Sequence, residues 1–103
     1  MSRANTKTYF VNVKDLSFKA EQIVVDLIRY LAEQLPQIEI VRNGQELEVT
    51  VPGSMSKRVI RLRIRKFLYR KSLSDDYRPI SFRDGDKDGY TVKEKKLIQL
   101  SYY

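Results

Sequence analysis

The stretch SKRVIRLRIRKFLYRKSL, residues 56–73, carries the strongest structural signal in this chain. Charged and apolar residues alternate strictly over residues 61–65, which is typical of a strand. Over the whole stretch, however, four apolar residues share one side of a helix: Ile60, Ile64, Phe67 and Leu68. Eighteen residues is long for a strand, and Arg, Lys and Leu are good helix formers. The pattern therefore predicts a helix with its apolar stripe on a core.

The same stretch carries eight cations and no acid: Lys57, Arg58, Arg61, Arg63, Arg65, Lys66, Arg70 and Lys71. Like charges on one element repel one another, so their density favours a polyanionic partner, and nucleic acid is the commonest in a cell. On the predicted helix, Arg58, Arg61 and Arg65 line one flank. Arg63, Lys66 and Arg70 line the other flank. The alternative is a solvated basic face with no partner, although such faces usually mix both signs of charge.

The positive charge lies in the second half of the chain. Residues 1–52 have a net charge of −1 and residues 53–103 a net charge of +8, within a chain of 103 residues and pI near 9.7. There is no cysteine and no histidine, which excludes disulfides, thiolate metal sites and histidine bases. No apolar run reaches the roughly 18–20 residues that span a bilayer, and the first residues lack the apolar stretch of a signal peptide. We expect a small intracellular protein that is cytoplasmic and has no membrane partner.

The segments before the basic stretch predict three further elements. Residues 8–13 are aromatic and β-branched, as in a strand, and residues 1–7 before them are expected to form a flexible basic arm. Apolar residues recur at three- and four-residue steps over 17–35, which predicts a helix that ends at Pro36. Alternating residues on either side of Asn43-Gly44 then indicate a β-hairpin over 38–51.

The segments after it predict a second hairpin and complete the fold. Residues 79–83 are expected to pair with part of 90–103 across the polar loop 84–89. The whole is an α+β domain over residues 8–103 in the order β-α-β-β-α-β-β. Two helices on one face of a mostly antiparallel sheet would bury both amphipathic helices.

The loop Asp84–Gly89 matches the opening of a calcium-binding loop, with carboxylates at positions one, three and five and glycine at six. Position twelve requires an acid that binds through both oxygens, and here it is Lys95. A polar hairpin turn explains the same residues. Because the chain also lacks a phosphate-binding loop and a histidine, we expect no catalytic site, metal, cofactor or small-molecule substrate.

The basic stretch indicates a polyanionic partner without showing which one, and RNA is one that suits it. Double-stranded RNA has a major groove too deep and narrow for a helix, so proteins contact its phosphates, 2′-hydroxyls and irregular loops. Arg outnumbers Lys five to three in the stretch, which favours bidentate phosphate contacts. Tyr69, on the side away from the apolar stripe, and Tyr77 are candidates for base stacking, and secondary contacts are expected from Arg3, Lys7 and Arg78. The alternative is a chromatin or architectural DNA-binding protein, because backbone binding depends little on sequence.

Together these residues resemble the eukaryotic-type large ribosomal subunit protein L-22 family. That family has a Val-Pro pair, then Ser-Lys-Arg at the start of a basic helix, then a terminal hairpin with aromatic and apolar residues. Here Val51-Pro52, Ser56-Lys57-Arg58 and Leu97–Tyr103 take those places. Eukaryotic members commonly end in an acidic tail, and its absence suggests an archaeal or reduced member.

The resemblance implies a structural constituent of the large ribosomal subunit, located in cytoplasmic ribosomes. Its partners would be ribosomal RNA and neighbouring ribosomal proteins. The family's RNA-binding helix corresponds here to six cations: Lys57, Arg58, Arg61, Arg65, Lys66 and Arg70. Arg63 and Lys71 add to this basic character, and Tyr69 stands where the family usually has a cation.

Overall fold

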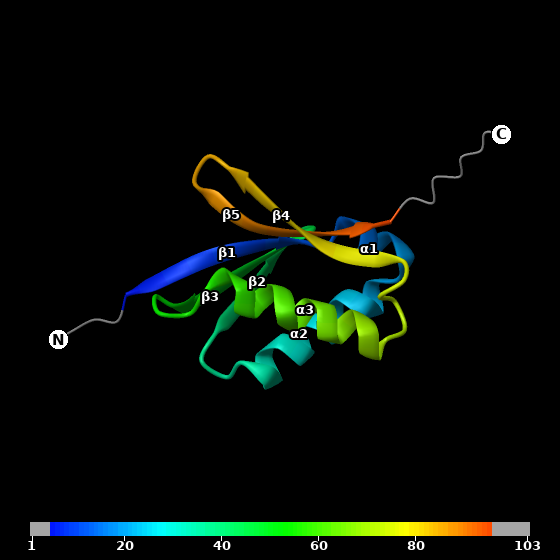
Figure 1. Ribbon diagram of the computed structural model, residues 1–103, viewed down its shortest axis with the longest axis horizontal. Coiled ribbons are helices and arrows are strands. Elements are labelled where there is room, and N and C mark those ends of the chain that lie inside the picture. The colour runs from blue at the N-terminus through cyan, green and yellow to red at the C-terminus, as the bar shows by residue number, and fades with distance from the viewer. Residues whose placement is uncertain (1–4, 96–103) are drawn as a thin grey trace.

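The computed structural model describes residues 5–95, which form an α+β fold with three helices and a five-stranded mixed sheet (Figure 1). The elements in chain order are β1 (Thr6–Asn12), α1 (Lys14–Lys19), α2 (Glu21–Gln34), β2 (Glu39–Asn43), β3 (Glu46–Pro52), α3 (Lys57–Arg70), β4 (Tyr77–Asp84) and β5 (Lys87–Glu94). The α+β class is the one that the sequence predicts. None of these helices is long and apolar enough to cross a membrane.

The number of helices differs from the prediction, because residues 14–34 form two helices and not one. Ala20 has extended backbone angles, φ −168° and ψ 127°, and separates α1 from α2. The reason is tertiary packing: α1 contacts β5, whereas α2 contacts β2 and α3. A single straight helix could not make both sets of contacts, so packing overrides the helix propensity of the sequence.

The sheet has the strand order β2-β3-β1-β5-β4, with β1 at its centre. Strand β1 pairs antiparallel with β3 but parallel with β5, and this parallel pair joins the two hairpins into one sheet. In the parallel pair Phe10 faces Gly89. A Cβ atom on Gly89 would lie only 1.8 Å from the carbonyl oxygen of Phe10, so the two strands can approach only because this residue is glycine.

Both predicted hairpins form, and each turns at a glycine. The second turn is shorter than predicted, because only residues 85–86 separate β4 from β5 and the rest of the predicted loop 84–89 belongs to the two strands. The two residues between β2 and β3 are Gly44-Gln45, and Gly85 is the first residue after β4. Gly44 has φ +69° and Gly85 has φ +60°, a conformation that favours glycine. The Asn-Gly pair predicted for the first turn is displaced by one position, because Asn43 ends β2 and faces Glu46 across the hairpin. Glycine at the first central position is typical of a type II′ turn.

The first strand begins earlier than predicted. It starts at Thr6, so Lys7 belongs to the sheet, where it faces Val51 of β3, and not to a flexible arm. Arg3 and the predicted strand residues Leu97–Tyr103 lie outside the described residues.

The core fixes the orientation of α3. The residues buried on α3 are Ile60, Ile64, Phe67 and Leu68, the same stripe that the sequence predicts. They belong to one core cluster with the buried residues of α2 and of the alternating positions of β3. In Figure 1, α2 and α3 lie together beneath the sheet, and α3 contacts the edge strand β4. The charged side of α3 is therefore turned away from the core, next to β4.

Candidate nucleic-acid interface

An open groove of about 790 Å³ lies between α3 and the start of β4. It is lined by five cations and no acid: Arg61, Arg65, Lys66, Arg78 and Lys95. Tyr69, Tyr77, Leu68, Pro79 and Ser74 complete its walls. The acids nearest in sequence, Asp75 and Asp76, do not line it. We refer to this feature as the α3–β4 groove.

The groove brings together six of the residues that the sequence predicts for RNA contact: Arg61, Arg65, Lys66, Tyr69, Tyr77 and Arg78. Of the two tyrosines, Tyr77 is buried, so only Tyr69 is available for stacking. Lys66 was expected on the opposite flank of the helix, with Arg63 and Arg70, but it lines the groove. Arg58 is exposed at the start of α3 and is not among the lining residues. Lys7 does not line the groove either, because it lies in β1 beside the end of β3.

Two of the eight predicted cations have carboxylate partners inside the molecule. Lys57 Nζ lies 2.6 Å from Asp88 Oδ1, and Lys71 Nζ lies 3.0 Å from Asp26 Oδ2. Across residues 5–95, the other six cations of the stretch form no ion pair with a carboxylate. Arg78 and Lys95 form none either, so no cation of the α3–β4 groove has a carboxylate partner within the described part of the chain.

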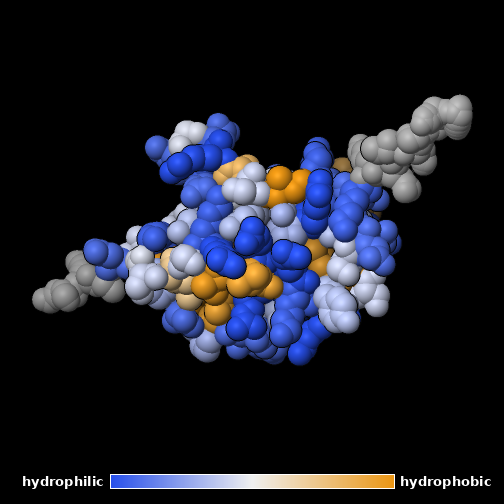
Figure 2. Space-filling view, viewed as in Figure 1, coloured by the Kyte–Doolittle hydropathy of each residue, from blue (hydrophilic) through white to orange (hydrophobic). Residues whose placement is uncertain are grey.

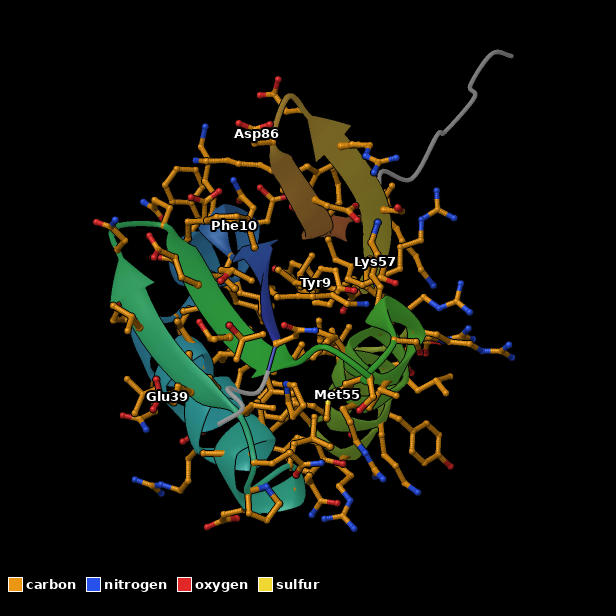
Figure 3. The ribbon with its side chains drawn as sticks, turned by 90° about the vertical axis from the view of Figure 1, so that its left-hand side faces the viewer. Tyr9, Phe10, Glu39, Met55, Lys57 and Asp86 are labelled. Carbon is orange, nitrogen blue, oxygen red and sulfur yellow. The ribbon has the colours of Figure 1, made fainter. Side chains whose placement is uncertain are left out.

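Lys57 joins the start of α3 to the β4–β5 hairpin (Figure 3). Its ammonium group donates hydrogen bonds to Asp88 at 2.6 Å and to Ser81 Oγ at 2.7 Å, and it lies 4.9 Å from the centre of the Tyr90 ring. The Tyr90 hydroxyl donates in return to the Lys57 carbonyl oxygen at 3.2 Å. Burial of this ring raises the pKa of the Tyr90 hydroxyl. These contacts hold the helix against the hairpin that carries the other wall of the groove.

The opposite flank of α3 faces α2 and is largely engaged there. Arg63 Nη1 donates to Gln34 Oε1 at 3.2 Å, and the Arg70 guanidinium lies 5.8 Å from the centre of the Tyr30 ring. Lys71 pairs with Asp26, whose pKa is lowered mainly by a hydrogen bond from Gln22 and then by Lys71. The prediction that both flanks of the helix present free cations is therefore wrong. One flank packs on α2, and the other borders the groove.

The groove combines charge with apolar surface. The Arg61 Nε atom is buried and has no hydrogen-bond partner among the described residues. Tyr77 is buried at the groove wall, and this burial is the main cause of the raised pKa of its hydroxyl. Tyr69 is 74% exposed. In Figure 2, hydrophilic side chains surround a small hydrophobic area over the first half of α3, where Leu62 is half exposed.

Lys95 is a lining residue that the sequence analysis did not select for binding. Its backbone N–H donates to the Asp76 carbonyl oxygen at 2.7 Å, and its Nζ donates to the Ser74 carbonyl oxygen at 2.8 Å. These bonds hold Lys95 beside the loop that precedes β4. Lysines at 93, 95 and 96 are visible in the sequence, but only the register of the β4–β5 hairpin places Lys95 at the groove.

The calcium alternative has no support in the described residues, which contain no group of three acidic side chains able to hold a metal ion. Asp84 and Asp88 belong to opposite strands of the hairpin, and Asp88 is paired with Lys57. Gly89 would be the sixth loop residue, but it lies in β5, where its lack of a Cβ atom allows the close approach to β1.

No family model matches this sequence, and a search of curated proteins finds no match. What the chain binds must therefore be inferred from the groove. Guanidinium and ammonium groups without carboxylate partners bind phosphate oxygens, and an exposed aromatic ring stacks on nucleobases. The arrangement is thus chemically suited to a polyanion that carries flat rings.

Proposed function

We propose that this protein binds RNA through the α3–β4 groove, as a structural and non-catalytic component of the large ribosomal subunit in the cytoplasm. The observation that carries the proposal is the groove itself, in which five cations meet without any acid. Such a concentration of one sign of charge raises the local concentration of a polyanion and speeds its association.

The side chains on the exposed side of α3 favour RNA over duplex DNA as the partner. A helix that reads DNA enters the major groove and presents several side chains to base edges. Here the exposed side of α3 mixes the cations Arg58, Arg65 and Lys66 with the uncharged Leu62 and Tyr69. This suits contacts with phosphates and irregular bases, which dominate RNA recognition.

The ribosomal assignment is supported by the resemblance to the L-22 family. The Val51-Pro52 pair that carries the resemblance lies at the end of β3, and Ser56 is the N-cap of α3. Ribosomal RNA and neighbouring ribosomal proteins are the partners that follow from it. Co-sedimentation of the tagged protein with large subunits tests this part, and recovery only in fractions free of ribosomes would contradict it.

Salt dependence tests the binding mechanism. If the five groove cations each neutralise one phosphate of a duplex region, the slope of log K against log salt is about −4 to −5. Arg65→Ala and Lys66→Ala should each flatten this slope by about one. Arg83→Ala is the matched control, because Arg83 is also exposed but lies outside the groove.

Three results would count against the proposal. A slope shallower than about −2 on structured RNA means that too few phosphates are neutralised. An effect of Arg83→Ala equal to that of Arg65→Ala means that the groove has no special role. Stronger binding of duplex DNA than of structured RNA at equal salt would favour the architectural DNA-binding alternative.

A further inference from the structure

We infer that the α3–β4 groove receives an unpaired nucleotide of the bound RNA, with its base stacked on Tyr69 and its flanking phosphates held by Arg65, Lys66 and Arg78. The inference rests on the proposed RNA-binding function and specifies the part of the RNA that the site takes. It distinguishes a bulge, a loop or a single-stranded end from a regular duplex.

The shape of the site is the first argument. A regular duplex presents rows of phosphates on a convex surface, and exposed cations contact these without any hollow. The groove is instead a hollow of about 790 Å³. This volume lies within the range of about 300–1,000 Å³ that is usual for pockets enclosing small molecules. A hollow of this size accommodates a group that leaves the helical stack.

The composition of the walls is the second argument. Leu68, Tyr77 and Pro79 give the groove an apolar part that phosphates cannot use. A nucleobase has two apolar faces and a polar edge, so it fits a site in which apolar and cationic groups stand side by side. Arg65, Lys66 and Arg78 are exposed and can hold the phosphates on either side of that base.

Tyr69 supplies the third argument. At 74% it is the most exposed large hydrophobic side chain in the described part of the chain. Within residues 5–95 its ring has no aromatic or cationic partner. It stands at the groove, on the side of α3 away from the core. A stacked base would cover a ring that the protein itself leaves in water.

Arg61 supplies the fourth argument, because its buried Nε–H has no acceptor among the described residues. A buried donor without an acceptor is unfavourable, so such groups are normally paired with protein, water or ligand. Arg61 also lines the groove. If the Arg61 side chain turns toward the groove, a carbonyl oxygen of the base or a phosphate oxygen would supply the missing acceptor.

The experiment compares two RNA hairpins that differ in one position. One carries a single bulged 2-aminopurine, and the other has a complementary nucleotide opposite the same 2-aminopurine. Fluorescence anisotropy gives the affinities, and the 2-aminopurine emission reports stacking. The variants are Tyr69→Ala, Tyr69→Phe and, as the matched control, Phe18→Ala, because Phe18 is a similarly exposed aromatic residue on α1 outside the groove. Both residues are exposed, so circular dichroism should show an unchanged fold for all three variants.

We expect the wild type to prefer the bulged hairpin and to change its 2-aminopurine emission. Tyr69→Ala should lose about 5- to 100-fold in affinity for the bulged hairpin and less than about twofold for the paired one. Tyr69→Phe should keep the wild-type affinity, since stacking needs the ring and not the hydroxyl. Phe18→Ala should behave as the wild type.

The inference is overturned if Tyr69→Ala leaves the bulged hairpin unaffected, or weakens both hairpins equally. In either case a steep salt dependence that responds to Arg65→Ala would leave the proposed RNA-binding function intact. If the wild type binds neither hairpin, the proposed function itself fails.

Discussion

Replacing Lys57 by Met separates the structural use of a cation from its use in binding. The sequence assigns Lys57 to RNA, but the structure shows its ammonium group bound to Asp88 and Ser81 and placed over the Tyr90 ring. A hydrogen bond to a charged group contributes about 1.5–3 kcal/mol and a cation–π contact about 0.5–1 kcal/mol. The side chains of Lys57 and Asp88 are 22% and 31% exposed, so water replaces part of what is lost. We expect a net destabilisation of about 1–2 kcal/mol.

Two measurements follow on the same protein samples. For a domain of this size, 1–2 kcal/mol lowers Tm by about 5–15 °C. Lys66→Met is the matched control, because Lys66 is exposed in the groove and its loss should change stability by less than about 0.5 kcal/mol. In RNA binding the order of the two effects should be the opposite. Lys57→Met should keep the wild-type slope of log K against log salt, and Lys66→Met should flatten it by about one.

The opposite pattern would refute the argument. Suppose that Lys57→Met has the Tm of the wild type but a slope of log K against log salt that is flatter by one. Lys57 then leaves Asp88 to contact phosphate, as the sequence alone suggests. Asp88→Asn provides an independent check, since it removes the carboxylate without touching α3. It should lower Tm to a similar extent, and the double variant should be less destabilised than the sum of the two single variants.

Three further predictions concern stability. Gly89→Ala should destabilise the fold by at least about 3 kcal/mol in urea unfolding, because its Cβ would collide with the backbone of β1; an unchanged midpoint would contradict the β1–β5 pairing. The hydrogen bond from Arg42 is the main cause of the lowered pKa of Glu21, so the stability from this pair is present above pH 4.5 and decreases as the pH falls through the lowered pKa. Melting from pH 6 to pH 3 should therefore be less pH-dependent in Glu21→Gln than in the wild type. Burial raises the pKa of Tyr77 and Tyr90, so their contribution to stability is complete below pH 10 and is lost as the pH rises through the raised values. Comparison of the absorbance titrations of Tyr77→Phe and Tyr90→Phe with that of the wild type should show that each variant lacks a hydroxyl that ionises above pH 10.

The sequence predicts α3 correctly because its apolar pattern is long and regular. Four apolar positions on one side and the absence of Pro and Gly from the helix outweigh the strand-like alternation over residues 61–65. The break at Ala20 could not be predicted, because alanine is the best helix former and nothing local ends the helix there. It results from contacts of α1 with β5, a strand that begins at Lys87, far along the chain. Pairing of β1 with β5 is equally remote in sequence.

The candidate site could be predicted in composition but not in detail. The cations of α3 are evident from the sequence, whereas their availability depends on distant residues. Asp88 lies 31 positions from Lys57, and Asp26 lies 45 positions from Lys71. No periodicity within residues 56–73 indicates which cation will meet an acid. Lys95 enters the groove for the same reason, through strand register.

The two halves of the chain differ in net charge, and the fold places them on opposite flanks of α3. Helix α2 comes from the N-terminal half, and its Asp26 and Glu33 border one flank of α3 together with Arg70 and Lys71. Strand β4 comes from the C-terminal half and adds Arg78 to the other flank. If the cations served solubility alone, acids on both flanks would reduce their repulsion equally well. Because no acid lines the α3–β4 groove within residues 5–95, no ion pair relieves the repulsion among its cations, and binding of a polyanion is what would relieve it.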